Sequence, residues 1–457
     1  MCGFAGFVEP TPARSRDESE RLIRQMADRL THRGPDDSGG WLNESGTVAL
    51  GHRRLAILDT SQHGHQPMTS PCGRFVLAYN GEVYNHQKLR RDLQHSGVAF
   101  RGQSDTETLV AAFSSWGILA TIERCIGMFA MAVWDTQDHS LTLIRDRLGI
   151  KPLYYGLSNG CLLFGSELKA LRTHPAFNAE LNRGAISRFL QHSYLPTPHT
   201  VYSNFRKLPA GCLLKVQNAP AKVSNNDLPQ PEAWWDARSV AEAARSTPFA
   251  GSFSEATNQL EETLTDAVQM RMLSDVPLGA FLSGGIDSSL VCALMQKQSS
   301  RPIQTFTIGF EEADYNEANH AKRIAEHLGT EHTEYYVTSN EARDVIPRLP
   351  EMYDEPFSDS SQIPTFLVSQ LARKQVTVVL SGDGGDELFG GYNRYFEIRK
   401  LWKMINRIPG RQLVSKLFAI PGHLLPGRWK ERFLYRAKLL GLNDATSLYQ
   451  IANLHWP

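Results

Sequence analysis

The first half of the chain carries short apolar runs with the length and composition of β-strands. They occupy residues 2–9, 47–59, 75–79, 129–135 and 141–145. Three other segments repeat apolar residues every three or four positions, which predicts helices at 18–31, 86–95 and 106–116. Because strands outnumber helices and do not alternate regularly with them, residues 1–210 are predicted to form an α+β domain.

The second half has a different order of elements after residue 253. Apolar strands are predicted at 277–282, 303–310, 332–337 and 376–380. Predicted helices precede, separate and follow them at 254–272, 288–298, 316–328 and 362–374. Regular alternation of strands and helices predicts an α/β domain with a doubly wound parallel sheet over residues 254–457.

Residues 211–253 join the two predicted domains. The segment is rich in turn-forming residues and has weak periodicity, so we interpret it as a linker. Trp234 and Trp235 interrupt its polar composition, and we expect them to dock on one of the domains.

Composition and charge narrow the classes of partner. The 457 residues exceed what one hydrophobic core usually supports, which agrees with two domains. Lys and Arg (48) balance Asp and Glu (48), so the charge gives no reason to expect nucleic acid or an anionic membrane as a partner. The six cysteines form no CxxC pair, and neither a signal peptide nor an apolar run of membrane-spanning length is evident. We therefore expect reduced thiols and a cytoplasmic location.

The cysteine at position 2 is a candidate nucleophile. After removal of Met1, Cys2 would carry a thiol and a free α-amine in one residue. An α-amine has an ordinary pKa of about 7.7–8.0, so it can accept the thiol proton near neutral pH. An incidental cysteine would explain the position alone equally well.

Residues suited to binding an amino-acid amide follow in the same half. The Asn80 side chain and the Gly81 N–H could stabilise an oxyanion, although an Asn-Gly pair alone is more often a hairpin turn. Arg54 could bind an α-carboxylate through its planar guanidinium. Glu82 and Asp105 could bind an α-ammonium group.

A glycine turn lies between a predicted strand and a predicted helix in the second half. It reads Leu282-Ser283-Gly284-Gly285-Ile286-Asp287-Ser288-Ser289. Its glycines would let the main chain approach a phosphate, and the helix N-terminus would supply N–H donors. Ser283 and Ser288 add hydroxyl groups, and Asp287 could bind Mg²⁺. No GxxxxGK string is present, and a generic tight turn is the alternative interpretation.

An acidic turn follows the last predicted strand. It reads Ser381-Gly382-Asp383-Gly384-Gly385-Asp386-Glu387. In a parallel sheet this turn would lie at the same carboxyl edge as the glycine turn, which is where open α/β sheets bind ligands. A solvated acidic loop is the alternative.

The motifs of the first half resemble, in order, the glutaminase domain of asparagine synthetases. They are Met1-Cys2-Gly3, His32-Arg33-Gly34-Pro35-Asp36, His52-Arg53-Arg54-Leu55-Ala56-Ile57-Leu58-Asp59, Tyr79-Asn80-Gly81-Glu82-Val83-Tyr84-Asn85, Ser104-Asp105, Gly127-Met128-Phe129-Ala130, the string 145–155 and the string 165–171. The glycine turn resembles the pyrophosphate loop of ATP pyrophosphatases. The resemblance implies an N-terminal nucleophile (Ntn) glutaminase domain followed by an ATP pyrophosphatase domain.

The resemblance also implies roles for matching residues. Cys2 would be the nucleophile, with the oxyanion hole at Asn80 and Gly81 and the glutamine-binding residues Arg54, Glu82 and Asp105. ATP and pyrophosphate would be bound by Ser283, Gly284, Gly285, Asp287, Ser288, Ser381 and Gly382. Phe281 and Ile308 match positions that line an adenine pocket, although ordinary core is the alternative. Asp383, where many relatives carry glutamate, would assist acyl-adenylate formation, and Mg²⁺ would bind Asp287 and Asp386.

The implied reaction is glutamine-dependent asparagine synthesis with ATP and Mg²⁺. Its small-molecule substrates would be glutamine, aspartate and ATP, and a homodimer is expected from the resemblance. Two alternatives remain: a family member with another carboxylate acceptor, such as a sugar acid of a surface polysaccharide, and a non-catalytic subunit.

One part of the family pattern has no match in this chain. A Glu-x-Arg-x-Pro-Phe-Leu-Asp string and a lysine that stabilises the acyl-phosphate are expected after the acidic turn, and neither is found before residue 457. We therefore expect the synthetase domain to be incomplete at its C-terminal end. A third alternative follows, namely a truncated copy that hydrolyses glutamine but makes little asparagine. Asp354 and Asp359 could help form the acceptor site or cap helices.

Overall fold

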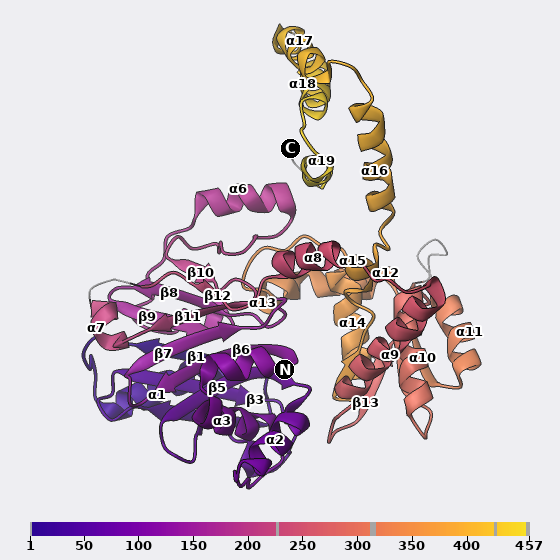
Figure 1. Ribbon diagram of the computed structural model, residues 1–457. Helices are drawn as coiled ribbons and strands as arrows, with labels where there is room; N and C mark the ends of the chain where they lie inside the picture. The colour runs from indigo at the N-terminus through magenta and orange to yellow at the C-terminus, as the bar shows by residue number, and fades with distance from the viewer. Residues whose placement is uncertain (1, 225–227, 311–316, 425–426, 454–457) are drawn as a thin grey trace.

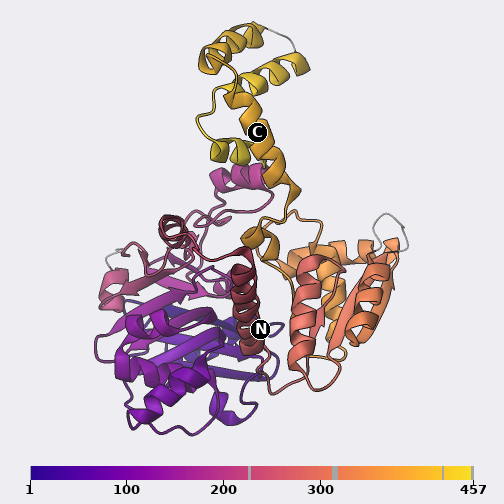
Figure 2. The same cartoon turned by 45° about the vertical axis from the view of Figure 1, so that its right-hand side comes forward.

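A computed structural model describes residues 2–224, 228–310, 317–424 and 427–453. The chain forms two bodies that lie side by side, with a group of C-terminal helices projecting from them (Figures 1 and 2). The first body contains two stacked sheets, and the second contains a smaller sheet between helices.

The first domain is built on two six-stranded antiparallel sheets. The first sheet has the order β10 (Phe205–Lys207), β8 (Tyr154–Ser158), β9 (Cys161–Gly165), β1 (Gly3–Val8), β3 (Val48–Arg54) and β2 (Asp37–Leu42). The second has the order β12 (Glu232–Ala233), β11 (Cys212–Val216), β7 (Ser140–Arg145), β6 (Gly127–Asp135), β5 (Phe75–Val83) and β4 (Met68–Thr69). Phe4 and Leu50 of the first sheet and Ala78 and Ala132 of the second belong to one buried core, so the two sheets pack face to face.

Helices cover the outer faces of both sheets. Leu22 and Met26 of α1 (Arg16–Asp28) pack in one core with Phe7 of the first sheet. The second sheet is covered by α2 (His86–His95), α3 (Asp105–Trp116) and α4 (Ile118–Arg124). Strands buried on both faces show no polar alternation, which is why β1 is apolar throughout. The predicted α+β fold class is confirmed.

The second domain contains a four-stranded parallel sheet. Its order is β15 (Glu331–Val337), β14 (Gln304–Phe310), β13 (Leu278–Phe281) and β16 (Val378–Leu380). One face is covered by α9 (Phe253–Arg271), α10 (Ile286–Gln298) and α11 (Ala318–Leu328), and the other by α14 (Gln362–Ala372). The predicted doubly wound fold is thus confirmed, although the predicted start of one helix at residue 316 lies outside the described residues.

The strand order places a switch point between β13 and β16. From β13 the chain adds β14 and β15 on one side, and it later returns to add β16 on the other side. Ligands of open α/β sheets bind outside the carboxyl ends of the strands at such a point. The glycine turn follows β13 and the acidic turn follows β16, so both candidate nucleotide-binding turns lie there.

The segment predicted as a linker contributes to the first domain. Strand β11 pairs with β7, and β12 pairs with β11, so two strands of the second sheet lie within residues 211–253. Trp234 donates its indole N–H to the Arg145 carbonyl at 3.2 Å and stacks on Phe129. The turn-rich composition around these strands did not predict them. They form because they pair with strands that lie far away in the chain.

The C-terminal helices extend away from both domains. They are α16 (Asn393–Asn406), α17 (Arg411–Leu424), α18 (Gly427–Leu440) and α19 (Ala445–Ala452). The short helix α15 (Gly385–Phe389) precedes them and lies beside the second domain. No helix among the described residues is both long and apolar enough to cross a lipid bilayer.

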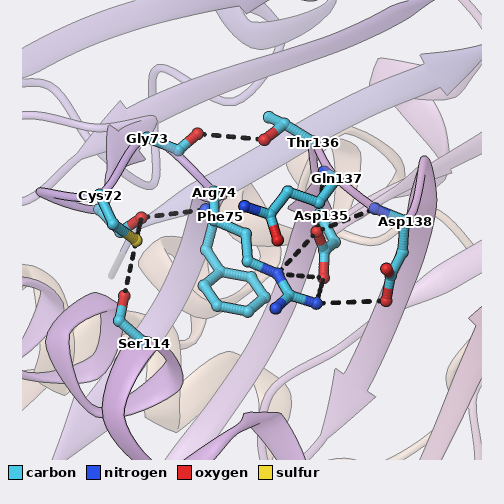
Figure 3. Close-up of polar contacts among 10 residues, drawn as sticks. Cys72, Gly73, Arg74, Phe75, Ser114, Asp135, Thr136, Gln137 and Asp138 are labelled. Atoms are coloured by element: carbon cyan, nitrogen blue, oxygen red, sulfur yellow. Dashed lines mark hydrogen bonds and ion pairs between the residues drawn. The ribbon is translucent and has the colours of Figure 1, made fainter.

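A polar cluster lies where β5 begins and β6 ends. Arg74 pairs with Asp135 at 2.8 Å and with Asp138 at 3.2 Å, so it ties the start of β5 to the turn after β6 (Figure 3). Beside it, the exposed Cys72 sulfur lies 3.3 Å from the Ser114 hydroxyl. Hydrogen bonds, the largest from Ser114, lower the pKa of this thiol.

Candidate functional site

The Cys2 side chain is half-buried at the start of β1. Its Sγ lies against the residue that follows β3: it accepts the Leu55 N–H at 3.3 Å and contacts the Leu55 carbonyl at 3.6 Å. Burial raises the pKa of the thiol, and the Leu55 hydrogen bond opposes this only in part. Cys2 therefore needs a proton acceptor when it acts as a nucleophile.

Asn80 and Gly81 lie inside β5 rather than after it. The strand, predicted to end at Tyr79, continues to Val83, which pairs with Gly127 of β6. Glycine and polar residues interrupt the apolar pattern here, but the ladder to β6 is unbroken. The hairpin-turn alternative for Asn80-Gly81 is therefore wrong.

The Asn80 side chain is a fully buried amide. None of the described residues hydrogen-bonds its Oδ1 or Nδ2, and its exposed fraction is 0%. Leaving a buried amide unpaired costs about 1–3 kcal/mol. Such a group is expected where a ligand atom completes the hydrogen bonding.

The Gly81 N–H is directed to the open edge of β5. In an antiparallel strand the N–H groups of alternate residues point to the same side. The Tyr79 N–H on this side is accepted by Gln66 at 2.8 Å, and the Val83 N–H by Asp105 at 3.0 Å. Gly81 lies between them, so its N–H points to the same edge.

Asp105 and Glu82 place two carboxyl groups near this edge. Asp105 is buried in the first turn of α3, where it also accepts the Tyr79 hydroxyl at 2.8 Å. Burial, and then the charge of Asp105, raise the pKa of Glu82 to about 7. Glu82 can therefore change its charge near neutral pH.

Arg54, at the end of β3, is buried against the loop that follows it. Its guanidinium donates to the carbonyls of Ser61 at 2.9 Å, of Leu58 at 3.2 Å and of Asp59. A guanidinium has five N–H donors, so others remain for a ligand.

One cavity of about 890 Å³ contains all six predicted glutaminase residues: Cys2, Arg54, Asn80, Gly81, Glu82 and Asp105. The second domain also lines it, with Phe366 from α14, Arg373 directly after that helix and Val378–Leu380 from β16. The cavity thus connects Cys2 with the strand that leads to the acidic turn.

The glycine turn holds two of its three serines together at the start of α10. Gly284 has a positive φ of 84°, and the Ser283 and Ser288 hydroxyls lie 2.9 Å apart. Ser288 is buried, whereas Ser283 and Gly285 are exposed to solvent. The turn and the helix N-terminus therefore leave N–H groups accessible to an anion.

The acidic turn packs directly on the glycine turn. A Cβ atom added to Gly382 would lie 2.6 Å from the Ser288 nitrogen, so only glycine permits this approach. Ser381 donates its hydroxyl to the exposed Asp383 carboxylate at 2.9 Å. Asp386 follows in the first turn of α15.

Asp287 and Asp386 have the donor type that Mg²⁺ prefers. Asp287 lies against the main chain of Gly385, the residue before Asp386: a Cβ on Gly385 would be 2.4 Å from its Oδ2. Carboxylate oxygens beside phosphates are the usual protein ligands of Mg²⁺ in nucleotide sites. These two residues therefore fit the metal.

Phe281 and Ile308 lie on the same face of the parallel sheet. Phe281 pairs with Phe306 of β14, and Ile308 is two residues further along that strand. Both side chains are half-buried near the carboxyl ends of their strands.

Several charged residues near the cavity did not stand out in the sequence. Lys151 lines it and is 2% exposed, and burial lowers its pKa to about 8. Arg33 donates Nε–H to the Cys2 carbonyl at 3.0 Å and pairs with Glu167 at 2.6 Å. Asp354, for which an acceptor-site role or a helix cap was considered, contacts Lys169 of the first domain. The one available signal was their position inside the strings shared with the family.

The fold and these sites define a two-domain protein in which an amidotransferase-type domain adjoins an α/β domain. Two family models match the chain, a glutamine amidotransferase domain at residues 1–226 and an asparagine synthase domain at residues 259–456. This chain belongs to the glutamine-hydrolysing asparagine synthetase family.

Curated relatives match most of the chain. Asparagine synthetase 1 of Bacillus subtilis is 34% identical over 90% of this chain and 61% of its own length. Putative asparagine synthetase 2 of Methanocaldococcus jannaschii is 33% identical over 91% of this chain and 81% of its own. The putative asparagine synthetase of Mycobacterium tuberculosis H37Rv is 36% identical over 87% of this chain. The chain spans 61% of the Bacillus and Mycobacterium relatives.

Proposed function

We propose that this chain hydrolyses glutamine at Cys2 and uses the ammonia to convert aspartate to asparagine, with ATP cleaved to AMP and pyrophosphate. The observation that best supports this function is one cavity lined both by Cys2 and by residues of β16. The cavity extends along β16 to Leu380, the residue before Ser381, and this supports a path from Cys2 toward the acidic turn.

In the first reaction the Cys2 sulfur attacks the amide carbon of glutamine. The proposal includes removal of Met1, after which the α-amine takes the thiol proton and delivers it to the leaving ammonia. The Asn80 amide and the Gly81 N–H stabilise the oxyanion, for which the unpaired Asn80 side chain is the support. Water then cleaves the thioester to release glutamate.

The glutamine head group would be held by three residues of the same cavity. Arg54 binds the α-carboxylate with its remaining N–H donors, and Glu82 and Asp105 bind the α-ammonium. An ammonium ion beside Glu82 would stabilise its carboxylate form, which reverses the effect of burial.

In the second reaction a carboxylate oxygen of aspartate attacks the α-phosphorus of ATP, and pyrophosphate leaves. The main-chain N–H groups of the glycine turn and the Ser283 and Ser288 hydroxyls would bind the phosphates. Asp287 and Asp386 would hold Mg²⁺, which neutralises phosphate charge when bound. Asp383 would orient the reacting groups, and Phe281 and Ile308 would contact the adenine ring.

Ammonia then displaces AMP from the activated carboxyl group. Transfer through the shared cavity would keep ammonia away from bulk water, where it is mostly protonated and no longer nucleophilic. We also propose that the enzyme is cytoplasmic and that it is a homodimer. Light scattering would test the dimer through its mass.

The test is one incubation with glutamine, aspartate and Mg-ATP, in which glutamate, pyrophosphate and asparagine are all measured. Formation of all three in step supports the proposal. Glutamate without asparagine would overturn the synthetase half, and a survey of other carboxylates, sugar acids included, would then test for a different acceptor. Absence of glutamate would overturn the glutaminase half.

A further inference from the structure

A loop of the second domain docks on the first domain through two neighbouring carboxylates. Glu355 pairs with Lys207 of β10 at 2.7 Å, and its other oxygen accepts the Val201 N–H at 3.0 Å. Asp354 accepts the main-chain N–H of Lys169 at 3.3 Å. Both carboxylates have an exposed fraction of 9%, and a carboxylate at such burial is costly unless it is paired.

Lys169 belongs to the first domain and holds this loop with its ammonium group. Its Nζ donates to the Glu351 carbonyl at 2.8 Å and lies 3.6 Å from the Asp354 carboxylate. The same Nζ lies 3.0 Å from the Glu167 carboxylate. Lys169 is therefore shared between the second domain and Glu167.

Glu167 links Lys169 to Cys2 through Arg33. Its carboxylate accepts Arg33 Nη1 at 2.6 Å, and Arg33 donates Nε–H to the carbonyl of Cys2 at 3.0 Å. Although burial alone would raise its pKa, hydrogen bonds from His32 and the charge of Arg33 lower it to about 2. Glu167 is thus a fixed anion between two cations, and the series Asp354–Lys169–Glu167–Arg33 ends on the main chain of Cys2.

We propose that Glu167 and Lys169 are positioning residues that couple the docked loop of the second domain to the orientation of Cys2. The inference rests on the glutaminase activity proposed above. With the loop docked, the Lys169 ammonium pairs with Glu167, and Glu167 pairs with Arg33. Arg33 in turn fixes the Cys2 carbonyl, which keeps the Cys2 Sγ in its hydrogen bond with the Leu55 N–H. The glutamine-binding residues lie outside this series.

This arrangement predicts a change in turnover rather than in substrate binding. Lys169→Met removes the shared cation with little change in side-chain length. We expect kcat for glutamate formation to fall about five- to tenfold, a range typical of coupling between sites, and KM for glutamine to stay within about twofold. Lys169→Arg should restore most of the rate, because it returns a cation to Glu167.

Lys207→Met is the matched control. Lys207 docks the same loop through Glu355, and its other hydrogen bond goes to the Leu195 carbonyl rather than into the series that ends on Cys2. It should keep the wild-type kcat. Equal losses in both variants, or an unchanged kcat in Lys169→Met, would overturn the inference.

Alkylation of Cys2 by iodoacetamide, followed by mass spectrometry, tests the inference separately from the proposed function. It needs no turnover, so it applies even if wild type forms no glutamate. Lys169→Met should react several-fold more slowly at pH 7.5, because loss of the Leu55 hydrogen bond disfavours the thiolate, and Lys207→Met should react like wild type. Identical rates in wild type and Lys169→Met would overturn the coupling.

Discussion

Asp287 at the start of α10 lies directly against Gly385 of the acidic turn. A Cβ atom at Gly385 would come within 2.4 Å of the Asp287 carboxylate, so a side chain there must displace it. The two turns follow different strands and pack against each other, and Gly385 leaves the space that the Asp287 carboxylate occupies.

Replacement of Gly385 by alanine should therefore impair the second reaction only. We expect pyrophosphate formation to fall about tenfold or more, because the carboxylate assigned to Mg²⁺ moves, while glutamate formation stays near the wild-type rate. Gly40→Ala is a suitable control, since its nearest neighbour would be an ordinary 3.6 Å contact. Equal pyrophosphate rates in Gly385→Ala and wild type would contradict the role of this contact.

Asn80 should separate activity from stability. Because its amide has no partner among the described residues, Asn80→Ala loses no hydrogen bond, and Tm should change by a few degrees at most. The kcat for glutamate formation should fall about 10²–10³-fold through loss of an oxyanion donor. Asn204→Ala should show the opposite behaviour, since it breaks bonds to the Leu157 and Asn178 carbonyls. A large loss of stability in Asn80→Ala with normal turnover would refute the assignment.

Cys2 should react with a glutamine analogue that alkylates thiols, such as a chloroketone. The exposed Cys72 is a competing target, because hydrogen bonds lower the pKa of its thiol. Mass spectrometry of Cys72→Ser should show one adduct, on Cys2. The loss of glutamate formation should be proportional to the fraction of Cys2 that is labelled. Protection by free glutamine is expected, and labelling of Cys2 that glutamine does not slow would count against a glutamine site.

Glu82 should produce a pH dependence near neutrality. Its pKa is raised to about 7 in the folded state, so the unfolded state binds fewer protons between about pH 4.5 and 7. The stabilising contribution of the protonated form is complete below about pH 4.5 and is lost as pH rises through 7. The Tm of wild type, relative to that of Glu82→Gln, should therefore fall between pH 5 and pH 8.

Glutamine binding should show the opposite trend with pH. The ionised form of Glu82 binds an ammonium group, so KM for glutamine should fall as pH rises through about 7. Steady-state kinetics of Glu82→Gln should lack this dependence. If KM decreased equally in wild type and Glu82→Gln, the pH dependence would belong to another group.

Much of the candidate site is predictable from local sequence. The glycine turn 282–289 and the acidic turn 381–387 each follow an apolar strand, and carboxyl ends of parallel strands share one edge of a sheet. These two facts are sufficient to place Asp287 and Asp383 at the same edge.

Other features depend on contacts between distant residues. Strand β5 continues through Gly81 because β6 pairs with it, and Cys212–Val216 is a strand because β7 lies beside it. Lys169 and Asp354 are 185 positions apart, and no local pattern relates them.

The order of strands and helices, the two turns and the candidate nucleophile can be predicted from the amino-acid sequence, because they depend on neighbours within a few residues. The burial of Asn80 without a partner among the described residues, and the cavity that reaches both domains, follow only from the folded arrangement. The same is true of Lys169, which is shared between Glu167 and the second domain. Burial and pairing at these positions arise when sheets and domains pack, and that packing brings together residues that are remote in the chain.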